Sequence, residues 1–528
     1  MQARIPRDIW LPLVLALAVL TVFGRGLVSP FLFDDPFHVS HNPFFQSESP
    51  LAEIWTKPYF GLYVPLVYSA WYGLWQIAGG EAWPFHLLNL ALHALNSVLV
   101  YRILRASEAS PGRSFLAAAL FAFHPLQVES VVWISEARGL MASSLTLAAL
   151  GFWLKAQAAR GFVSQAASLL AKPSTAFVPL AVAAASRLRG KKMIAFYWPL
   201  AVVVAGIGAL AFAARLQNLP VLGSELDILA RLELAIASLG FLTAKIVWPW
   251  PLSVDYGLTP ARLLPTRYWI AGVAMGLTWI ALFRRAKEKQ NPTALTGLLL
   301  FALAWFPLSG LFATGFQSYS VVADRYAYLP LAGLAIAVAS LIRAPQRPRV
   351  WRFAGAALVL VLAGLSFHQT RIWKDAITLF THAVDVDENG FLAQSNLAWA
   401  LYGESRIPEA YEHFRAANKI LPIDAGPLVG VMLCLTKTSD HPASIRIASD
   451  ALRHEEFLRY NQSSVHLPKL YFTLGYNHAQ LGQWPQAYEA FCRSKELSRI
   501  GPPEPGVLAN IEKLERSRGY ASCKVPRN

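Results

Sequence analysis

The chain has 528 residues, of which 55% are apolar and 15% are charged, whereas an ordinary soluble domain has about 25% charged residues. This composition excludes a purely soluble protein, because too few charges are present to cover so much apolar surface. The net charge of +15 would suggest nucleic acid in a soluble protein, but basic residues between membrane spans also set topology. With no stacking platform, zinc finger or basic helix in the sequence, we expect an integral membrane protein in contact with lipid and without nucleic acid.

Apolar segments recur as far as about residue 367, and many approach the ~20 residues that a helix needs to cross the hydrocarbon. The longer segments lie near 10–29, 85–105, 139–158, 193–213, 267–283, 292–312, 327–342 and 350–367. Shorter candidates lie at 114–125, 162–172 and 173–186. Two more, 62–79 and 228–249, are interpreted as interfacial or re-entrant helices. Because backbone groups in lipid must be satisfied internally, the prediction is an all-α bundle of about 11 spans over residues 1–367.

Clusters of Lys and Arg between the apolar segments predict the orientation, because such clusters face the cytoplasm. They are Arg4/Arg7, Arg102/Arg105/Arg113, Arg187/Arg189/Lys191/Lys192, Arg284/Arg285/Lys287/Lys289 and Arg343/Arg347/Arg349/Arg352. Threading the spans through these clusters places the loop 30–84 and everything from residue 368 onward outside the cytoplasm.

The composition becomes that of a soluble domain after residue 368, and a repeat of 34 residues appears. Ala376, Phe380 and Ala383 recur as Ala410, Phe414 and Ala417, and a later unit has Leu474, Gly475, Ala487 and Phe491. Small residues let two antiparallel helices approach, and the Phe fills the groove to the next repeat, which is the tetratricopeptide pattern. We therefore predict a tetratricopeptide-repeat α-solenoid over 368–528, with a concave surface for binding a protein or peptide.

The three cysteines, Cys434, Cys492 and Cys523, all lie in this C-terminal part and form no CxxC pair. Outside the cytoplasm thiols can oxidise, so Cys434 and Cys492 are candidates for a disulfide. The alternative is that both are buried thiols in the repeat core.

Two adjacent carboxylates, Asp34 and Asp35, come directly after the first predicted span. A carboxylate at the membrane boundary could abstract a proton from an acceptor hydroxyl or bind a divalent cation. An ordinary turn is the alternative.

Further polar residues lie on or beside the spans. His86, Asn89, His93 and Asn96 step by three or four, so they share one helix face. That face predicts either hydrogen bonds between helices or a polar cavity. His124, Glu129, Glu136 and Arg138 follow near the next boundary.

Two boundary cations, Lys172 and Arg325, the latter within Asp324-Arg325-Tyr326, suit a lipid phosphate. Snorkelling to the interface is the alternative for both.

An ordered set of motifs covers nearly the whole chain. They are Phe33-Asp34-Asp35 with Asn42-Pro43, Phe85-His86-Leu87-Leu88-Asn89 through His93, His124 to Glu129, Lys172-Pro173, Pro249 to Tyr256, Asp324 to Pro330, and Arg371-Ile372-Trp373. In these motifs and in its repeats the chain resembles the transmembrane and tetratricopeptide-repeat O-mannosyltransferase-like family, in particular its bacterial members. That family belongs to the membrane glycosyltransferases with the C-type fold.

The resemblance implies transfer of a sugar, mannose in this family, from a polyprenyl-phosphate donor to a protein Ser or Thr. It implies a bacterial inner-membrane protein with its repeats in the periplasm. Asp34 matches the base and Asp35 its support, while Lys172 and Arg325 match phosphate contacts. We expect His86, His93, His124, Glu129, Arg138 and Tyr326 to support the site. No cofactor is required by the sequence, and a divalent metal stays open.

Two departures from the family pattern stand out. Val64 precedes Pro65 where the family has Arg, and the stretch 155–170 is shortened. They leave a second interpretation, a non-catalytic membrane-anchored repeat scaffold for protein–protein interaction.

Overall fold

The computed structural model describes residues 7–188, 226–341, 348–422, 424–453, 466–498 and 507–518, together with residues 205, 206, 208, 520 and 523. Over these residues the secondary structure is helical and contains no strand, which confirms the predicted all-α fold class. The chain forms two compact units, one made of the described residues up to Leu379 and one of those from Phe380 onward.

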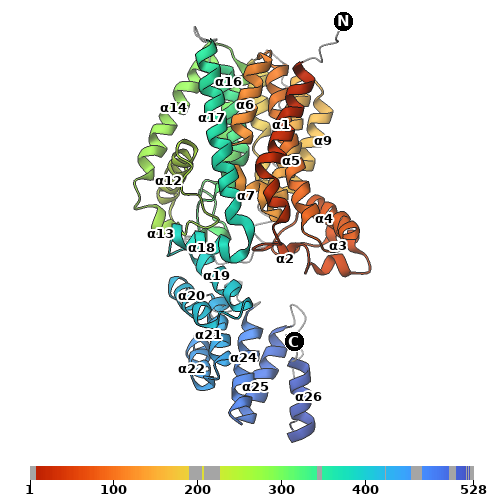
Figure 1. Ribbon diagram of the computed structural model, residues 1–528, viewed down its shortest axis with the longest axis vertical. Coiled ribbons are helices and arrows are strands. Elements are labelled where there is room, and N and C mark those ends of the chain that lie inside the picture. Colours follow the sequence, from red (N-terminus) through yellow and green to blue (C-terminus); the bar gives the residue numbers. More distant parts are fainter. Residues whose placement is uncertain are drawn as a thin grey trace. The chain divides into compact units, whose positions relative to one another are not determined.

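The first unit is a bundle of apolar helices (Figure 1). Its helices are α1 (Arg7–Phe23), α2 (Asp35–His38), α3 (Pro50–Thr56), α4 (Pro65–Ala78), α5 (Trp83–Ala106), α6 (Pro111–Ala122), α7 (Gln127–Val132), α8 (Ala137–Leu154), α9 (Ala158–Ala171), α10 (Pro179–Leu188), α12 (Ile228–Val247), α13 (Pro260–Leu263), α14 (Tyr268–Glu288), α15 (Pro292–Trp305), α16 (Tyr328–Leu341) and α17 (Pro348–Gln369). Several begin at a proline, which fits the first helical turn because its missing N–H has no partner to lose there.

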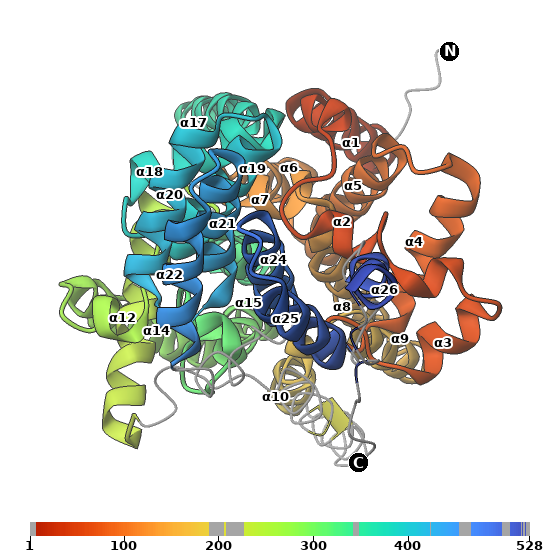
Figure 2. The ribbon, with the colours of Figure 1, turned by 90° about the horizontal axis from the view of Figure 1, so that it is seen from below.

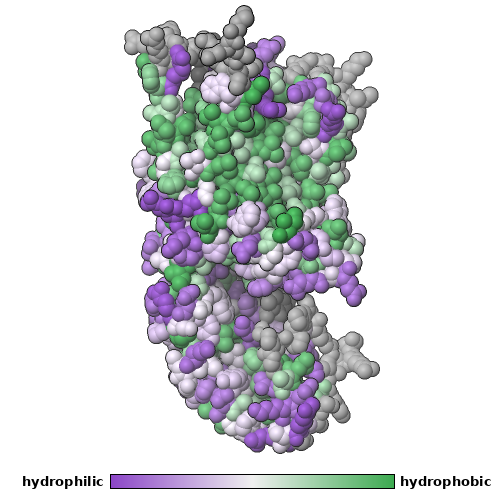
Figure 3. Space-filling model, turned by 45° about the vertical axis from the view of Figure 1, so that its right-hand side comes forward, coloured by the Kyte–Doolittle hydropathy of each residue, from purple (hydrophilic) through white to green (hydrophobic). Residues whose placement is uncertain are grey.

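Four described helical segments are long and apolar enough to cross a membrane: Asp8–Val28, Trp83–Ala106, Ile134–Leu154 and Arg352–Lys374. They coincide with four of the predicted spans, and the chain is an integral membrane protein. On the face shown in Figure 3, the helices of the first unit carry a broad apolar band. The total of about 11 crossings stays a prediction. The segment 193–213, apart from residues 205, 206 and 208, lies outside the described residues, as do the cations Arg4, Arg189, Lys191, Lys192, Arg343 and Arg347.

Glycines bring the backbones of α15 and α16 into contact. A Cβ added at Gly333 would lie 2.5 Å from the backbone nitrogen of Phe301, and one at Gly297 would lie 2.5 Å from that of Ala337. Small residues at helix interfaces allow such close packing inside membranes, where the hydrophobic effect does not drive helices together. Gly240 of α12 makes a similar approach to Tyr268 at the start of α14.

Two of the predicted cytoplasmic clusters lie at the same end of the bundle. Arg105, in the last turn of α5, donates to Asp8 Oδ1 at the start of α1 over 2.6 Å, and Tyr101 donates to the same oxygen over 2.8 Å. The cluster at the N-terminus and the cluster after α5 are therefore on one side, as the orientation requires.

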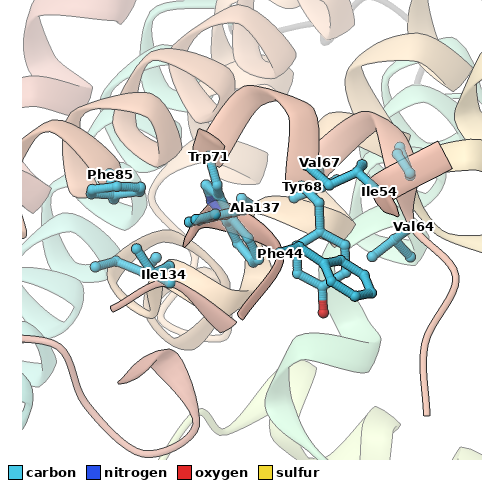
Figure 4. Close-up of a cluster of buried hydrophobic side chains, with 13 residues drawn as sticks. Phe44, Ile54, Val64, Val67, Tyr68, Trp71, Phe85, Ile134 and Ala137 are labelled. Carbon is cyan, nitrogen blue, oxygen red and sulfur yellow. The ribbon is translucent and has the colours of Figure 1, made fainter. Parts of the chain in front are cut away.

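The first loop between spans folds into α3 and α4 beside the bundle. Seen from below, α4 lies next to α9 (Figure 2). Its 14 residues reach about 21 Å, which is short of the ~30 Å hydrocarbon core. One face of α4 buries Val67, Tyr68 and Trp71 against Ile134 and the neighbouring residues of a shared apolar core (Figure 4). This core holds the loop against the bundle.

The second unit is built from antiparallel helical hairpins. Its helices are α18 (Ala376–Val386), α19 (Phe391–Gly403), α20 (Ile407–Ile420), α21 (Ala425–Lys437), α22 (His441–Leu452), α24 (Leu467–Gln480), α25 (Trp484–Leu497) and α26 (Val507–Arg518). Phe414 of α20 packs over Gly430 of α21, where an added Cβ would lie 2.4 Å from the ring. The aromatic ring thus fills the groove to the next hairpin, as the repeat pattern predicts.

The predicted disulfide between Cys434 and Cys492 is wrong. Cys492 of α25 pairs instead with Cys523, with their Cα atoms 5.7 Å apart, and Cys434 is a buried free thiol in α21. Apolar residues of α26, among them Val507 and Ile511, pack on α25, and this packing brings Cys523 beside Cys492.

Candidate active site

The two adjacent aspartates point into different environments. Asp35 begins α2 and is fully buried. Its carboxylate accepts hydrogen bonds from the backbone N–H of Leu32 at 3.0 Å and from the N–H and hydroxyl of Ser135 at 2.9 and 2.5 Å. Asp35 therefore fastens the first loop to the 3-10 turn Ile134–Glu136 that precedes α8.

Asp34 keeps part of its side chain exposed, with a relative exposure of 22%. The residue before it, Phe33, has a φ of 57° in the left-handed region and stacks on Trp133, with ring centroids 5.2 Å apart. A bulky residue in that conformation costs free energy, and such positions cluster at functional sites. The turn at Phe33 sets the direction of the Asp34 carboxylate.

His38 and Tyr68 complete a chain of contacts behind Asp34. His38 Nε2 lies 3.3 Å from Asp34 Oδ2, and His38 Nδ1 lies 2.8 Å from the Tyr68 hydroxyl. When Nε2–H donates toward the carboxylate, Nδ1 accepts from the tyrosine. Both side chains are buried, and the imidazole lies beside one oxygen of the Asp34 carboxylate. Sequence analysis did not identify this pair, although the spacing of four residues between Asp34 and His38 is one helical turn.

The neighbours of the two carboxyl groups separate their pKa values. Burial raises the pKa of Asp34, but the attraction of His38 and then of Arg138 outweighs burial and lowers that pKa to about 2. Burial, followed by repulsion from Asp34, raises the pKa of Asp35 to about 8, even though three donors face it. Asp34 is consequently the carboxylate that stays ionised near neutral pH and can accept a proton.

A second cluster joins four of the predicted residues where α8 begins, α9 ends and α16 is about to begin. Lys172 Nζ lies 3.0 Å from Glu136 Oε2. The backbone N–H of Arg325 donates to Glu129 Oε2 at 2.9 Å, and its guanidinium donates to Glu129 Oε1. Arg325 Nε is 3.9 Å from Glu136. Both predicted phosphate contacts thus have carboxylate partners.

The rest of the cluster encloses these ion pairs. The Arg325 guanidinium lies 5.3 Å from the ring centroids of Trp133 and Tyr326 and 4.6 Å from that of Phe316. A Cβ added at Gly139 would lie 2.6 Å from Glu136 Oε2, so a larger residue there would require the Glu136 carboxylate to shift. Arg138 Nε donates to the carbonyl oxygen of Ser135 at 2.6 Å. Through Ser135, the second cluster is connected to Asp35.

The polar face of α5 forms hydrogen bonds between helices. His86 Nε2 lies 3.0 Å from the Ser29 carbonyl, and His93 bonds both the Tyr328 hydroxyl at 2.8 Å and the Ala122 carbonyl at 3.0 Å. Asn89 and Asn96 donate to the carbonyl oxygens of Trp133 and Leu140. His124 Nε2 similarly lies 3.0 Å from the Ile246 carbonyl. These predicted supporting residues hold the helices around the site.

Across the part of the chain that the structure describes, no group of three or more His, Cys, Asp or Glu side chains is placed to hold a metal ion. The described polar groups are those of a proton acceptor beside a buried network of ion pairs.

The fold and this site define a class: a helical integral membrane protein with a built polar site at one end of its spans and a unit of helical hairpins. No family model matches the chain. It is 24% identical over 478 residues to the human protein O-mannosyl-transferase TMTC3, covering 78% of this chain and 52% of that protein. It is 23% identical to Drosophila melanogaster protein O-mannosyl-transferase Tmtc3, covering 79% of this chain and 56% of that protein.

A shorter match has higher identity: human protein O-mannosyl-transferase TMTC4 is 30% identical over 168 residues, which is 27% of this chain and 23% of that protein. The chain spans about half the length of the longer matching relatives. The similarity confirms the predicted resemblance: proteins named protein O-mannosyl-transferases align with more than three quarters of this chain at 23–24% identity.

Proposed function

We propose that this protein is a membrane glycosyltransferase that moves a sugar, mannose by analogy with its named relatives, from a polyprenyl-phosphate donor to a hydroxyl group of protein Ser or Thr. The observation that carries the proposal is an ionised, partly exposed Asp34 held by His38 close to a network containing Lys172 and Arg325. A base for the acceptor and cations for a phosphate are the two parts that this transfer requires.

The reaction inverts the sugar carbon in one displacement. Asp34 takes the proton of the acceptor hydroxyl while that oxygen attacks the anomeric carbon of the sugar. The bond from this carbon to the phosphate oxygen breaks, and its electron pair leaves with the lipid phosphate. Cations in the cluster around Lys172 and Arg325 offset the charge that develops on the phosphate, which accelerates the reaction if the transition state is bound more tightly than the donor.

The proposed location is the non-cytoplasmic face, in a bacterial inner membrane with the repeats in the periplasm. The basic clusters support this orientation. The Cys492–Cys523 disulfide supports it as well, because structural disulfides form in oxidising compartments. The hairpins from α19 onward would hold the acceptor protein.

Purified full-length protein, a polyprenyl-phosphate mannose and an acceptor peptide test this function. Replacing Asp34 by Asn keeps its size but removes its basicity, so turnover should fall by roughly 10²–10⁴, the range for a lost general base. Donor binding, measured on the same samples, should stay unchanged. Loss of donor binding in Asp34→Asn would instead indicate a structural or metal-binding aspartate.

A non-catalytic scaffold is the second candidate, and one observation favours it. Both Lys172 and Arg325 are already neutralised by buried glutamates, which is also what a purely structural network requires. Equal labelling of the acceptor by wild type and Asp34→Asn would support the scaffold and contradict the transferase mechanism.

A further inference from the structure

The distribution of charge in the network singles out one cation. The network contains the carboxylates Glu129 and Glu136 and the cations Lys172, Arg325 and Arg138. Arg325 pairs with Glu129, and Lys172 pairs with Glu136. Among the residues that the structure describes, Arg138 has no carboxylate within 4.0 Å. Counting these five side chains alone leaves one positive charge, on Arg138, which the ionised Asp34 carboxylate of the adjoining site partly offsets.

One nitrogen of the Arg138 guanidinium is hydrogen-bonded to the protein, and the other two are available to a ligand. Its Nε donates to the Ser135 carbonyl at 2.6 Å, which leaves the two Nη groups of the guanidinium fork for a ligand. The side chain is half-buried, so a ligand can still reach it. Arg138 is also the second residue of the 18-residue helix α8, whose N-terminal end adds a partial positive charge.

Arg138 lies between the two parts of the site. Its guanidinium donates to the carbonyl oxygen of Ser135, whose N–H and hydroxyl hold Asp35, and the next residue, Glu136, is the partner of Lys172. A phosphate bound to its Nη groups would consequently be next to both the base and Lys172. Arg325, which is 8% exposed and enclosed by three aromatic rings, is less accessible.

We propose that Arg138 makes the direct, forked contact with the phosphate of the lipid donor, that Lys172 is the second cation, and that Arg325 positions Glu129 and Glu136. This inference rests on the proposed function and refines its donor site. The phosphate of a sugar–phosphate–lipid diester is negatively charged, and a guanidinium without a carboxylate partner can bind it. A planar guanidinium can bind two phosphate oxygens at once, whereas an ammonium binds as a point charge.

Binding of undecaprenyl monophosphate to the purified full-length protein in detergent, followed by native mass spectrometry, tests the assignment. Arg138→Gln should weaken this binding at least tenfold, and Arg138→Lys should weaken it less because the charge is kept. Uncharged polyprenol should bind equally to all variants. The matched control is Arg160→Gln, an exposed arginine at the other end of α9, which should bind like wild type.

Two further probes distinguish the source of the phosphate. Phosphatidylglycerol and inorganic phosphate are added as competitors; competition by phosphatidylglycerol at equal concentration would show a general headgroup site and overturn the donor assignment. Equal binding by Arg138→Gln and Arg160→Gln would overturn the role of Arg138. Asp34→Asn separates this proposal from the function, because it should lose turnover while binding undecaprenyl monophosphate like wild type.

Discussion

At the scale of single residues, the site depends on the different surroundings of two neighbouring aspartates. The carboxylate oxygens of Asp35 accept hydrogen bonds from Leu32 and Ser135. The carboxylate of Asp34 is partly exposed and lies beside His38. The sequence predicted both aspartates and both boundary cations. It could not predict Ser135 or Tyr68 as partners, because they are 100 and 30 residues away from the residues they contact and a hydroxyl carries no distinctive pattern.

His38 should control the protonation of Asp34. In the wild-type protein, activity that needs ionised Asp34 is present above its lowered pKa of about 2 and is lost only as pH falls through that value. His38→Ala removes the largest stabilising neighbour, so the acid limb of kcat/KM should move to higher pH. The turnover should also fall by roughly 10²-fold, the effect of a misplaced reacting group.

Profiles of kcat/KM between pH 4 and pH 8 provide the measurement: wild type should show no acid limb in this range, whereas His38→Ala should show one. His38→Gln keeps a hydrogen-bond donor and should recover part of the loss, and Tyr68→Phe should have the smaller effect because it leaves the contact to Asp34 intact. A purely structural histidine would lower activity equally at every pH, without any shift of the limb.

At the scale of elements, segment positions followed from the sequence better than their ends did. The prediction of 292–312 became α15, Pro292–Trp305, followed by a 3-10 turn with Pro307, because proline cannot continue a helix. The predicted 62–79 became α4, whose burial of Tyr68 and Trp71 depends on a core assembled from distant segments. Apolar content alone does not reveal which face of a helix meets protein and which meets lipid.

The contact between α15 and α16 should tolerate no side chain at Gly333. Alanine there would place its Cβ 2.5 Å from the Phe301 nitrogen, so the helices must separate, at a cost of about 1–3 kcal/mol as for overpacked cores. Gly276→Ala on α14 is the control, because nothing lies within 4 Å of an added Cβ and alanine is the better helix former. Thermal unfolding in detergent should show a lower midpoint for Gly333→Ala only; equal midpoints would show that α15 and α16 are looser than described.

At the scale of the whole molecule, we predict that the C-terminal unit lies outside the cytoplasm and that its disulfide is therefore formed. A reporter that works only outside the cytoplasm, fused after Asn528, should be active. Thiol labelling without reductant should then modify Cys434 alone after unfolding, because Cys492 and Cys523 are joined. Activity of a cytoplasm-specific reporter at the same position would reverse the topology and place the candidate site on the opposite face. The order of spans and repeats was readable from composition and period, whereas this disulfide required the packing of α26.

The ion pair between Glu129 and Arg325 can form only after Arg325 has been synthesised, so the complete site forms late in biosynthesis. The two residues are 196 positions apart, so at ~5–20 residues per second the ribosome adds the arginine roughly 10–40 s after the glutamate. Throughout that interval Glu129 must be accommodated at the membrane by the insertion machinery, by water or by a proton. A nascent chain that stops before residue 325 therefore carries Glu129 without its arginine partner.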